Sequence, residues 1–248
     1  MPAIWFNSET PATKFAPNLK IPLYTAHEGN DTFIDSLVQQ IYTFEEQIIN
    51  EDLVSEVPRS GNDPYPYTQH WKQHNLFWDV DGKDGNNLKR FPMSVELETF
   101  FHIVRKQYLL FLKELNYSRH KVYVHAWANV LRDGQWISKH HHTADNYSYL
   151  SGTYYLTTNP TYLKVISPIR LDQMEMFATK KAAIVMFPSW VPHESDVYKG
   201  SDTRVSLAFD ICMENSMLAN PWRPHVLLDD PKTMDGFEMY LKDRSLTN

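Results

Sequence analysis

The chain has 248 residues, of which 42% are hydrophobic and 14% aromatic, a composition that excludes extended disorder and allows a sizeable buried core. Its formal net charge of -6 excludes a strong overall attraction to nucleic acid or to anionic membranes. Cys212 is the single cysteine, which excludes an internal disulfide and a cysteine-based metal site; His, Asp and Glu remain as metal ligands, and a reducing, cytoplasmic compartment is expected.

Two segments of the first half carry apolar residues at helical spacing. The first, 31–51, follows Asn30, and either Asn30 or Asp31 can cap its free N–H groups. The second, 94–115, has two glutamates in its first turn, where they suit the helix dipole. Its aromatic stripe is typical of a packed core rather than of a cofactor site, so we predict two long helices that pack on another layer.

The segment between these helices, 56–91, is rich in Pro, Gly, Asn and aromatic residues. Such a composition is typical of a loop that covers a pocket, and equally of an irregular surface segment. A run that begins at Asp79 resembles a calcium loop, but its sixth residue is not glycine and its twelfth is Arg90 instead of a bidentate Glu. We therefore interpret it as a turn.

From residue 121 onward the hydrophobic period changes from helical to two, which indicates strands. Short strand candidates follow one another between turn residues, as expected for an antiparallel jelly roll. We predict a mainly β fold with flanking helices: a double-stranded β-helix, which is a cupin-like jelly roll, with two long helices packed on one face. The predicted strands are 121–130, 135–142, 148–157, 163–167, 174–178, 182–187, 193–198 and 204–213.

The chain shows no linker-like composition and no repeat, so we expect one domain over 1–248. Within it, 1–120 supplies the helices and the loop-rich segment, 121–213 the jelly-roll core, and 214–248 a C-terminal extension. The N-terminus lacks the pattern of a signal peptide, and the longest apolar run, 182–192, is too short to span a bilayer. GxGxxG, GxxxxGK[ST] and GxSxG patterns are missing, which argues against phosphate loops and serine hydrolases.

Histidines gather at one place in the predicted β region. His140 and His142 are two apart, so on a strand both aim inward, whereas His141 faces outward. A neighbouring strand can bring His193 to the same point. The alternative interpretation is a polar cluster of surface histidines, because most histidines are not ligands.

An arginine lies eleven residues after His193, in an otherwise apolar strand. Arg204 shares its face with Ser206, and this face is opposite to the one that carries Val205 and Leu207. An arginine aimed into the barrel must meet an anion, and its planar fork suits a carboxylate. The alternative partner is a structural acid such as Asp210.

The set His140-x-His142, His193 and Arg204-x-Ser206 resembles the Fe(II)- and 2-oxoglutarate-dependent oxygenases, whose pattern is His-x-Asp/Glu, a distal His and an Arg or Lys about ten residues later. The resemblance implies that Fe(II) is bound by His140, His142 and His193. It also implies that Arg204, assisted by Ser206, holds the distal carboxylate of the cosubstrate 2-oxoglutarate.

Two further residues match motifs within that superfamily. Asn129, with Gly134 between it and His140, is similar to the lead-in of the nucleic-acid-dealkylating members and implies a contact near the keto end of 2-oxoglutarate. Tyr155 resembles the second Tyr of the Tyr-Tyr-Leu strand of prolyl hydroxylases, which implies a contact with the distal carboxylate. Together the motifs between 123 and 211 look like a group of 2-oxoglutarate oxygenases found in marine bacteria and their phages.

One position departs from the superfamily pattern. His142 stands where a carboxylate is usual, and Asp145 follows three residues later, across a predicted bend. Three neutral imidazoles leave the full 2+ charge of the metal, one unit more than the usual set, which should attract the 2-oxoglutarate dianion and hold iron less firmly. Asp145 can supply the carboxylate directly or through a ligand histidine.

The resemblance implies a dioxygenase that converts 2-oxoglutarate and O2 to succinate and CO2 and hydroxylates a substrate that the sequence does not identify. His140, His142, His193 and Arg204 are its expected catalytic residues. The alternative is a metal-binding, cupin-like protein without oxidative activity, or an inactive descendant of an oxygenase. Nucleic-acid dealkylation is disfavoured by the acidic charge, so neither nucleic acid nor a membrane is an expected partner.

Overall fold

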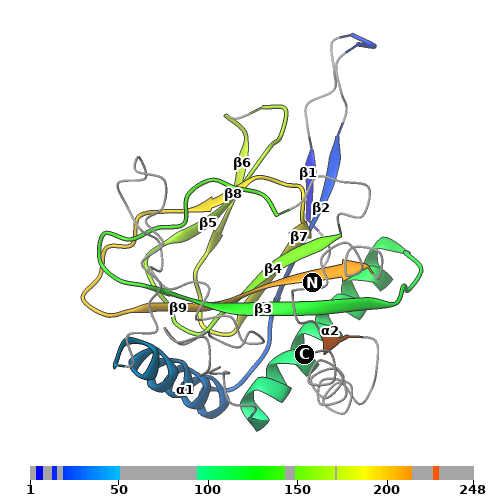
Figure 1. Cartoon of the computed structure of the whole chain (residues 1–248). Helices are drawn as coiled ribbons and strands as arrows, with labels where there is room; N and C mark the ends of the chain where they lie inside the picture. Colours follow the sequence, from blue (N-terminus) through cyan, green and yellow to red (C-terminus); the bar gives the residue numbers. More distant parts are fainter. Residues whose placement is uncertain are drawn as a thin grey trace, which may run out of the picture.

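The computed structural model describes residues 4–7, 13–15, 19–50, 94–142, 149–170, 172–213 and 226–228. The predicted loop-rich segment 56–91 and Asp145 lie outside these residues. The described part forms three layers: two helices, a large antiparallel sheet and a small antiparallel sheet (Figure 1). The mainly β fold with two long helices on one face is confirmed.

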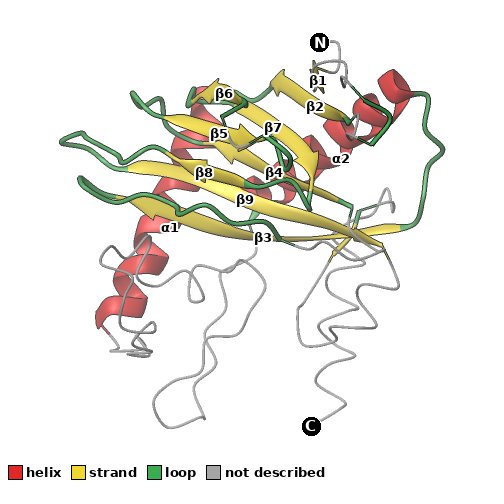
Figure 2. Cartoon of the chain, turned by 90° about the horizontal axis from the view of Figure 1, so that it is seen from above, coloured by secondary structure: helices red, strands yellow, loops and turns green. Residues whose placement is uncertain are grey.

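Ten strands make up the two sheets of the described residues, and every neighbouring pair is antiparallel. The large sheet has the order β1 (Ile4–Asn7), β2 (Lys20–His27), β7 (Ala183–Pro188), β4 (Leu150–Tyr155), β9 (Arg204–Met213), β3 (Val122–Leu131) and β10 (Val226–Leu227). The small sheet has the order β6 (Met174–Ala178), β5 (Tyr162–Ile166) and β8 (His193–Ser195). Figure 2 shows the two sheets from above.

Both predicted helices are present, as α1 (Asp31–Asn50) and α2 (Val95–Leu115). Asn30 caps α1, because its Oδ1 accepts a hydrogen bond of 2.9 Å from the backbone N–H of residue 33. Ser94 caps α2 in the same way, at 3.1 Å from the N–H of residue 97. No helix in the described residues combines the length and apolar character needed to cross a membrane.

The main core lies between the helices and one face of the large sheet. Phe100 of α2 lies edge-on to Phe209 of β9, with ring centroids 6.1 Å apart, and 5.9 Å from the ring of Tyr154 of β4. Because strand residues alternate between faces, the neighbours Thr153 and Tyr155 point away from the helices, toward the small sheet. This alternation gives the large sheet one apolar face and one face that is free to build a site.

Gly152 of β4 is required where β4 and β9 meet. A Cβ at this position would lie 2.7 Å from the carbonyl oxygen of Val185 and would clash with Cζ and Cε2 of the Phe209 ring. Gly152→Ala is therefore expected to destabilise the protein by roughly 1–3 kcal/mol, as overpacking of a tight core does. Urea unfolding measures the loss, and Phe209→Leu in the same chain should recover part of it; a Gly152→Ala protein as stable as the wild type would contradict the packing.

The segment predicted as a strand at 135–142 is not a regular strand, and this prediction is wrong. It pairs with β8 only through an isolated bridge between His140 and His193, whose backbones exchange hydrogen bonds of 3.0 and 2.8 Å. The next pair joins the N–H of Ser195 to the carbonyl of Ile137, so two residues on one side face one on the other. Such an extra residue interrupts the ladder as a β-bulge does.

Three strands of the described residues were not predicted. β1 is the edge strand of the large sheet, and β2 lies between β1 and β7. Pro22 pairs with Trp5 of β1 but lies outside the part of β2 that pairs with β7, so it has a strand neighbour on one side only. β10 pairs with β3 at the opposite edge. All three lie at the margin of the sheet or extend it, and β1 and β10 are too short to show a period of two in the sequence.

Candidate metal and anion site

A cavity of about 330 Å³ lies between the two sheets. It is lined by the free face of β3, β4 and β9, by β8 with a residue of β5, and by the segment 137–142. All seven site residues predicted from the sequence line this one cavity: Asn129, His140, His142, Tyr155, His193, Arg204 and Ser206.

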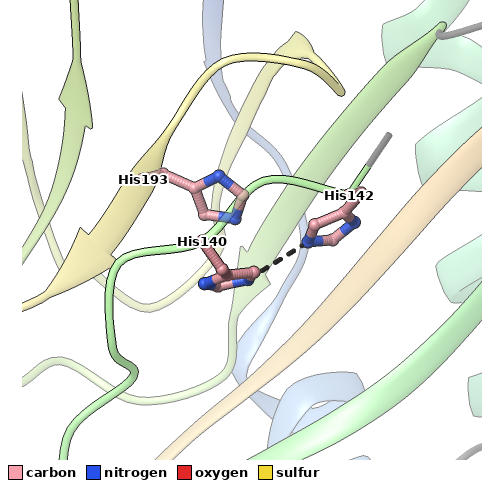
Figure 3. Close-up of side chains that lie close together, drawn as sticks. All are labelled: His140, His142 and His193. Atoms are coloured by element: carbon pink, nitrogen blue, oxygen red, sulfur yellow. Dashed lines mark hydrogen bonds between the residues drawn. The ribbon is translucent and has the colours of Figure 1, made fainter. Parts of the chain in front are cut away.

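Three histidines converge at one end of the cavity. His140 and His142 come from the irregular segment that precedes β4, and His193 begins β8 (Figure 3). One ring nitrogen from each lies within 4.8 Å of the others, and the Nε2 atoms of His140 and His142 are 3.3 Å apart. The bridge between the backbones of residues 140 and 193 holds the two segments together, so the backbone sets this convergence.

Each of the three imidazoles has an acceptor at its other nitrogen. Nδ1 of His140 lies 2.7 Å from the carbonyl oxygen of Ser138, and Nδ1 of His193 lies 3.0 Å from that of Val191. Nδ1 of His142 contacts the carboxylate of Asp210. A carbonyl or carboxylate oxygen only accepts, so each Nδ1 donates its hydrogen and each neutral ring keeps its lone pair on Nε2.

Burial favours the neutral form of two of these rings, His140 and His193. It lowers the pKa of His193 well below its ordinary value, with further lowering by His140 and His142. The pKa of His140 is also lowered, first by burial and then by His142. Two Nε2 lone pairs that face each other at 3.3 Å repel unless a cation lies between them. The donor set therefore fits a divalent transition metal that prefers imidazole ligands.

Asp210 of β9 is a part of this site that the sequence analysis did not assign to it. It is buried, and its Oδ1 accepts a hydrogen bond of 2.6 Å from Ser151 besides its contact with His142. Burial acts to raise the pKa of Asp210, but His142, His125 and Ser151 outweigh it and hold the net pKa below the ordinary range. Asp210 lies an even number of residues after both Arg204 and Ser206 on one strand, and this spacing is the sequence signal that places all three on the same face.

The other end of the cavity carries a buried arginine, two of whose nitrogens lack a partner among the described residues. Arg204 is only 2% exposed, yet its Nε and Nη1 have no hydrogen-bond partner among the described residues. The hydroxyl of Tyr155, equally buried, also lacks one, and the Arg204 Cζ lies 5.6 Å from the centre of the Tyr155 ring. Burial raises the pKa of Tyr155, so its hydroxyl stays protonated and can donate. Buried donors without partners indicate a binding site for an anion.

The register of β9 decides between the two partners considered for Arg204. Asp210 lies six residues along the same strand, about 20 Å away at the usual rise per residue, and it contacts His142 instead. Asp210 is therefore not the structural partner of Arg204. Asn129 of β3 pairs directly with Ser206, so both lie in the cavity wall between the two ends.

No family model and no curated protein matches the sequence. The solved structure of a Pseudomonas putida prolyl-4-hydroxylase matches with a TM-score of 0.50 and 12% identity over 77% of this chain and 88% of its own. The viral collagen prolyl hydroxylase of Paramecium bursaria Chlorella virus-1, solved as a 2OG complex, matches with a TM-score of 0.48 and 12% identity over 77% of this chain and 96% of its own.

The Trichoplax adhaerens prolyl hydroxylase, solved with a hypoxia inducible factor peptide fragment, has a TM-score of 0.48 and 11% identity over 80% of this chain and 86% of its own. The structural match to the bacterial enzyme, with its TM-score of 0.50, identifies the fold. The chain has the double-stranded β-helix fold of the 2-oxoglutarate oxygenases. In this oxygenase fold, the cavity with the three histidines lies between the large and the small sheet.

Proposed function

We propose that this protein is an Fe(II)- and 2-oxoglutarate-dependent dioxygenase. In the proposed reaction, 2-oxoglutarate and O2 are converted to succinate and CO2, and the second oxygen atom is inserted into a C–H bond of a further substrate. One observation carries the proposal: a buried arginine with unpaired N–H groups and three convergent histidines share one cavity.

The positions of the residues in this cavity support the following roles. His140, His142 and His193 would hold Fe(II). When bound, Fe(II) would reduce O2, and this reduction drives oxidation of the substrate. Arg204 would bind the distal carboxylate of 2-oxoglutarate in the bidentate manner that its fork allows, and the dry surroundings strengthen this pair. The protonated Tyr155 would donate a further hydrogen bond to the same carboxylate.

In this proposal, the remaining wall would orient the cosubstrate. Ser206 lies two residues after Arg204 on the same face of β9, and would add a hydroxyl donor near the distal carboxylate. Asn129, opposite Ser206, would contact 2-oxoglutarate nearer to its keto group. Both side chains are buried, so water has little access to these contacts.

Succinate release tests this function. The purified protein, loaded with Fe(II) and given 2-oxoglutarate and O2, is expected to release succinate slowly even without a second substrate, and N-oxalylglycine should inhibit the release. The competing function is a metal-binding, cupin-like protein without oxidation. Tight metal binding with neither succinate release nor any affinity for 2-oxoglutarate would support that function and overturn ours.

A pair of adjacent tyrosines offers a matched prediction. Tyr155→Phe removes a hydroxyl without a partner in the described residues, so it should weaken 2-oxoglutarate binding by roughly 0.5–3 kcal/mol at an unchanged melting temperature. Tyr154→Phe, on the opposite face of β4, removes a hydrogen bond of 2.7 Å to the carbonyl of Glu28. It should lower stability by about 1 kcal/mol and leave 2-oxoglutarate affinity unchanged.

Calorimetry with the Mn(II)-loaded protein and thermal unfolding measure the two quantities. If Tyr155→Phe lowers the melting temperature and keeps the affinity, Tyr155 is a residue of the core and not of the cosubstrate site.

A further inference from the structure

We propose that Asp210 is a positioning residue for the metal ligand His142, and that it supplies the negative charge that the three neutral histidines lack. The inference rests on the proposed function, because it concerns the metal that the histidines would hold. The carboxylate that balances the charge of the metal would then be Asp210, in the middle of the large sheet, and not Asp145.

The contacts of the three ligands differ in one respect. His140 and His193 donate from Nδ1 to the neutral backbone carbonyls of Ser138 and Val191. His142 alone in the triad donates to a charged group, the carboxylate of Asp210. An imidazole held by a carboxylate is fixed in one tautomer and is a stronger donor to the metal through its opposite nitrogen.

Asp210 is itself held rigidly for this role. It is 6% exposed and lies on β9, whose neighbours in the sheet are β3 and β4. The strand register places Ser151 of β4 directly beside it, and the Ser151 hydroxyl donates to Oδ1 at 2.6 Å. His125 of β3 is its partner on the other side, with Nε2 at 3.6 Å from Oδ2. A buried carboxylate without partners is costly, so these contacts fix both the position and the charge of Asp210.

The charge balance explains what Asp210 would do. Three neutral imidazoles leave a bound divalent metal with both positive charges, and one ionised carboxylate in contact with a ligand lowers the charge of the whole site to one. This is the charge that a direct carboxylate ligand would give. Asp210 thus allows an all-histidine ligand set to hold the metal firmly and still attract an anionic cosubstrate.

The same geometry predicts a conflict if a carboxylate is introduced at position 142. In His142→Asp, a carboxylate oxygen would branch from Cγ as Nδ1 does now, and so would face the Asp210 carboxylate. Two carboxylates in contact repel or share a proton, and either outcome weakens the new ligand. Asp210→Asn removes the charge, keeps the shape, and gives an amide that can donate to the new carboxylate.

The test is therefore the effect of Asp210→Asn in two backgrounds, read as the dissociation constant for Co(II) in competition with a chromophoric chelator. In the wild-type background we expect weaker Co(II) binding by roughly 10- to 100-fold. In the His142→Asp background we expect the opposite, with Co(II) binding at least about 10-fold tighter than in His142→Asp alone. Glu194→Gln is the matched control. Glu194 follows His193 in the chain and lines the cavity, but its carboxylate pairs with Lys164 and makes no hydrogen bond or ion pair with a histidine of the triad among the described residues.

A change of the same sign in both backgrounds would overturn the inference, because a residue that only supports the fold acts alike in each. Unchanged Co(II) affinity in Asp210→Asn, or an equal loss in Glu194→Gln, would also overturn it. Circular dichroism and melting temperature establish that the variants are folded before Co(II) is added.

A measurement on the wild type needs no substitution. Proton NMR of the Co(II)-loaded protein should show three strongly shifted, exchangeable N–H signals, one from each Nδ1–H of the triad. Two such signals would mean that His142 does not bind through Nε2 while donating to Asp210, and the inference would fail. Failure of the wild type to bind Co(II) or to release succinate would instead defeat the proposed function, so the two failures are distinguishable.

Discussion

Arg204→Ala is expected to weaken binding of 2-oxoglutarate by about 2–5 kcal/mol, while metal binding persists. The side chain is buried and two of its nitrogens have no partner in the described residues, so the cosubstrate carboxylate would complete a buried ion pair. Truncation leaves that carboxylate buried without its cation, which costs more than loss of an exposed ion pair. Calorimetry of 2-oxoglutarate binding to the Mn(II)-loaded protein measures the effect.

Arg132→Ala is the matched control for this variant. This substitution also removes one positive charge and one long side chain. Arg132, however, pairs with Glu45 at 2.6 Å and does not line the cavity of the triad. Its 2-oxoglutarate affinity should equal that of the wild type. Equal affinities in the wild type and Arg204→Ala would remove Arg204 from the cosubstrate site.

The second large effect concerns the metal itself. His142→Ala and His193→Ala should each reduce bound iron from one equivalent to a small fraction, because each would remove one of the three proposed ligand atoms. His141→Ala should retain the metal, since His141 is the exposed member of the run and does not belong to the triad. Iron or Co(II) content after gel filtration provides the measurement.

Asp145→Ala distinguishes between His142 and Asp145 as the third metal ligand, the two alternatives that the sequence left open. If His142 is the third ligand, this variant keeps its metal. Loss of metal in Asp145→Ala together with retention in His142→Ala would instead identify the carboxylate as the ligand. Asp145 lies outside the residues that the structure describes, so only the measurement decides between them.

The positions that the sequence predicted well are those where one periodicity holds along a whole element. In β9 every second residue from Arg204 to Asp210 faces the cavity, so the cavity face of this strand could be predicted once the strand was recognised. The same is true of β4, where Ser151 and Tyr155 face the cavity and Tyr154 faces the helices. The two amphipathic helices were predicted for the corresponding reason, with Ser94 marking a start.

What the sequence could not give depends on contacts between distant segments. The segment that carries His140 and His142 follows an irregular path because its pairing with β8 has an extra residue, and no local pattern reports this. The contact between Asp210 and His142 joins residues 68 positions apart and depends on the register of β9 against β4. Strand β2, which lies between β1 and β7, contains Pro22, and proline lowers strand propensity when read locally.

The bridge between His140 and His193 has a consequence for how the fold opens. It joins the 137–142 segment to β8 of the small sheet. Within the described part of the chain no helix packs on the small sheet, whereas α1 and α2 pack on the large sheet from the other side (Figure 1). Under the proposed function, a metal held by both histidines would act as a crosslink between the 137–142 segment and β8. Their amide hydrogens should then exchange slowly with solvent only in the loaded protein, so that metal occupancy sets the local opening rate of the small sheet.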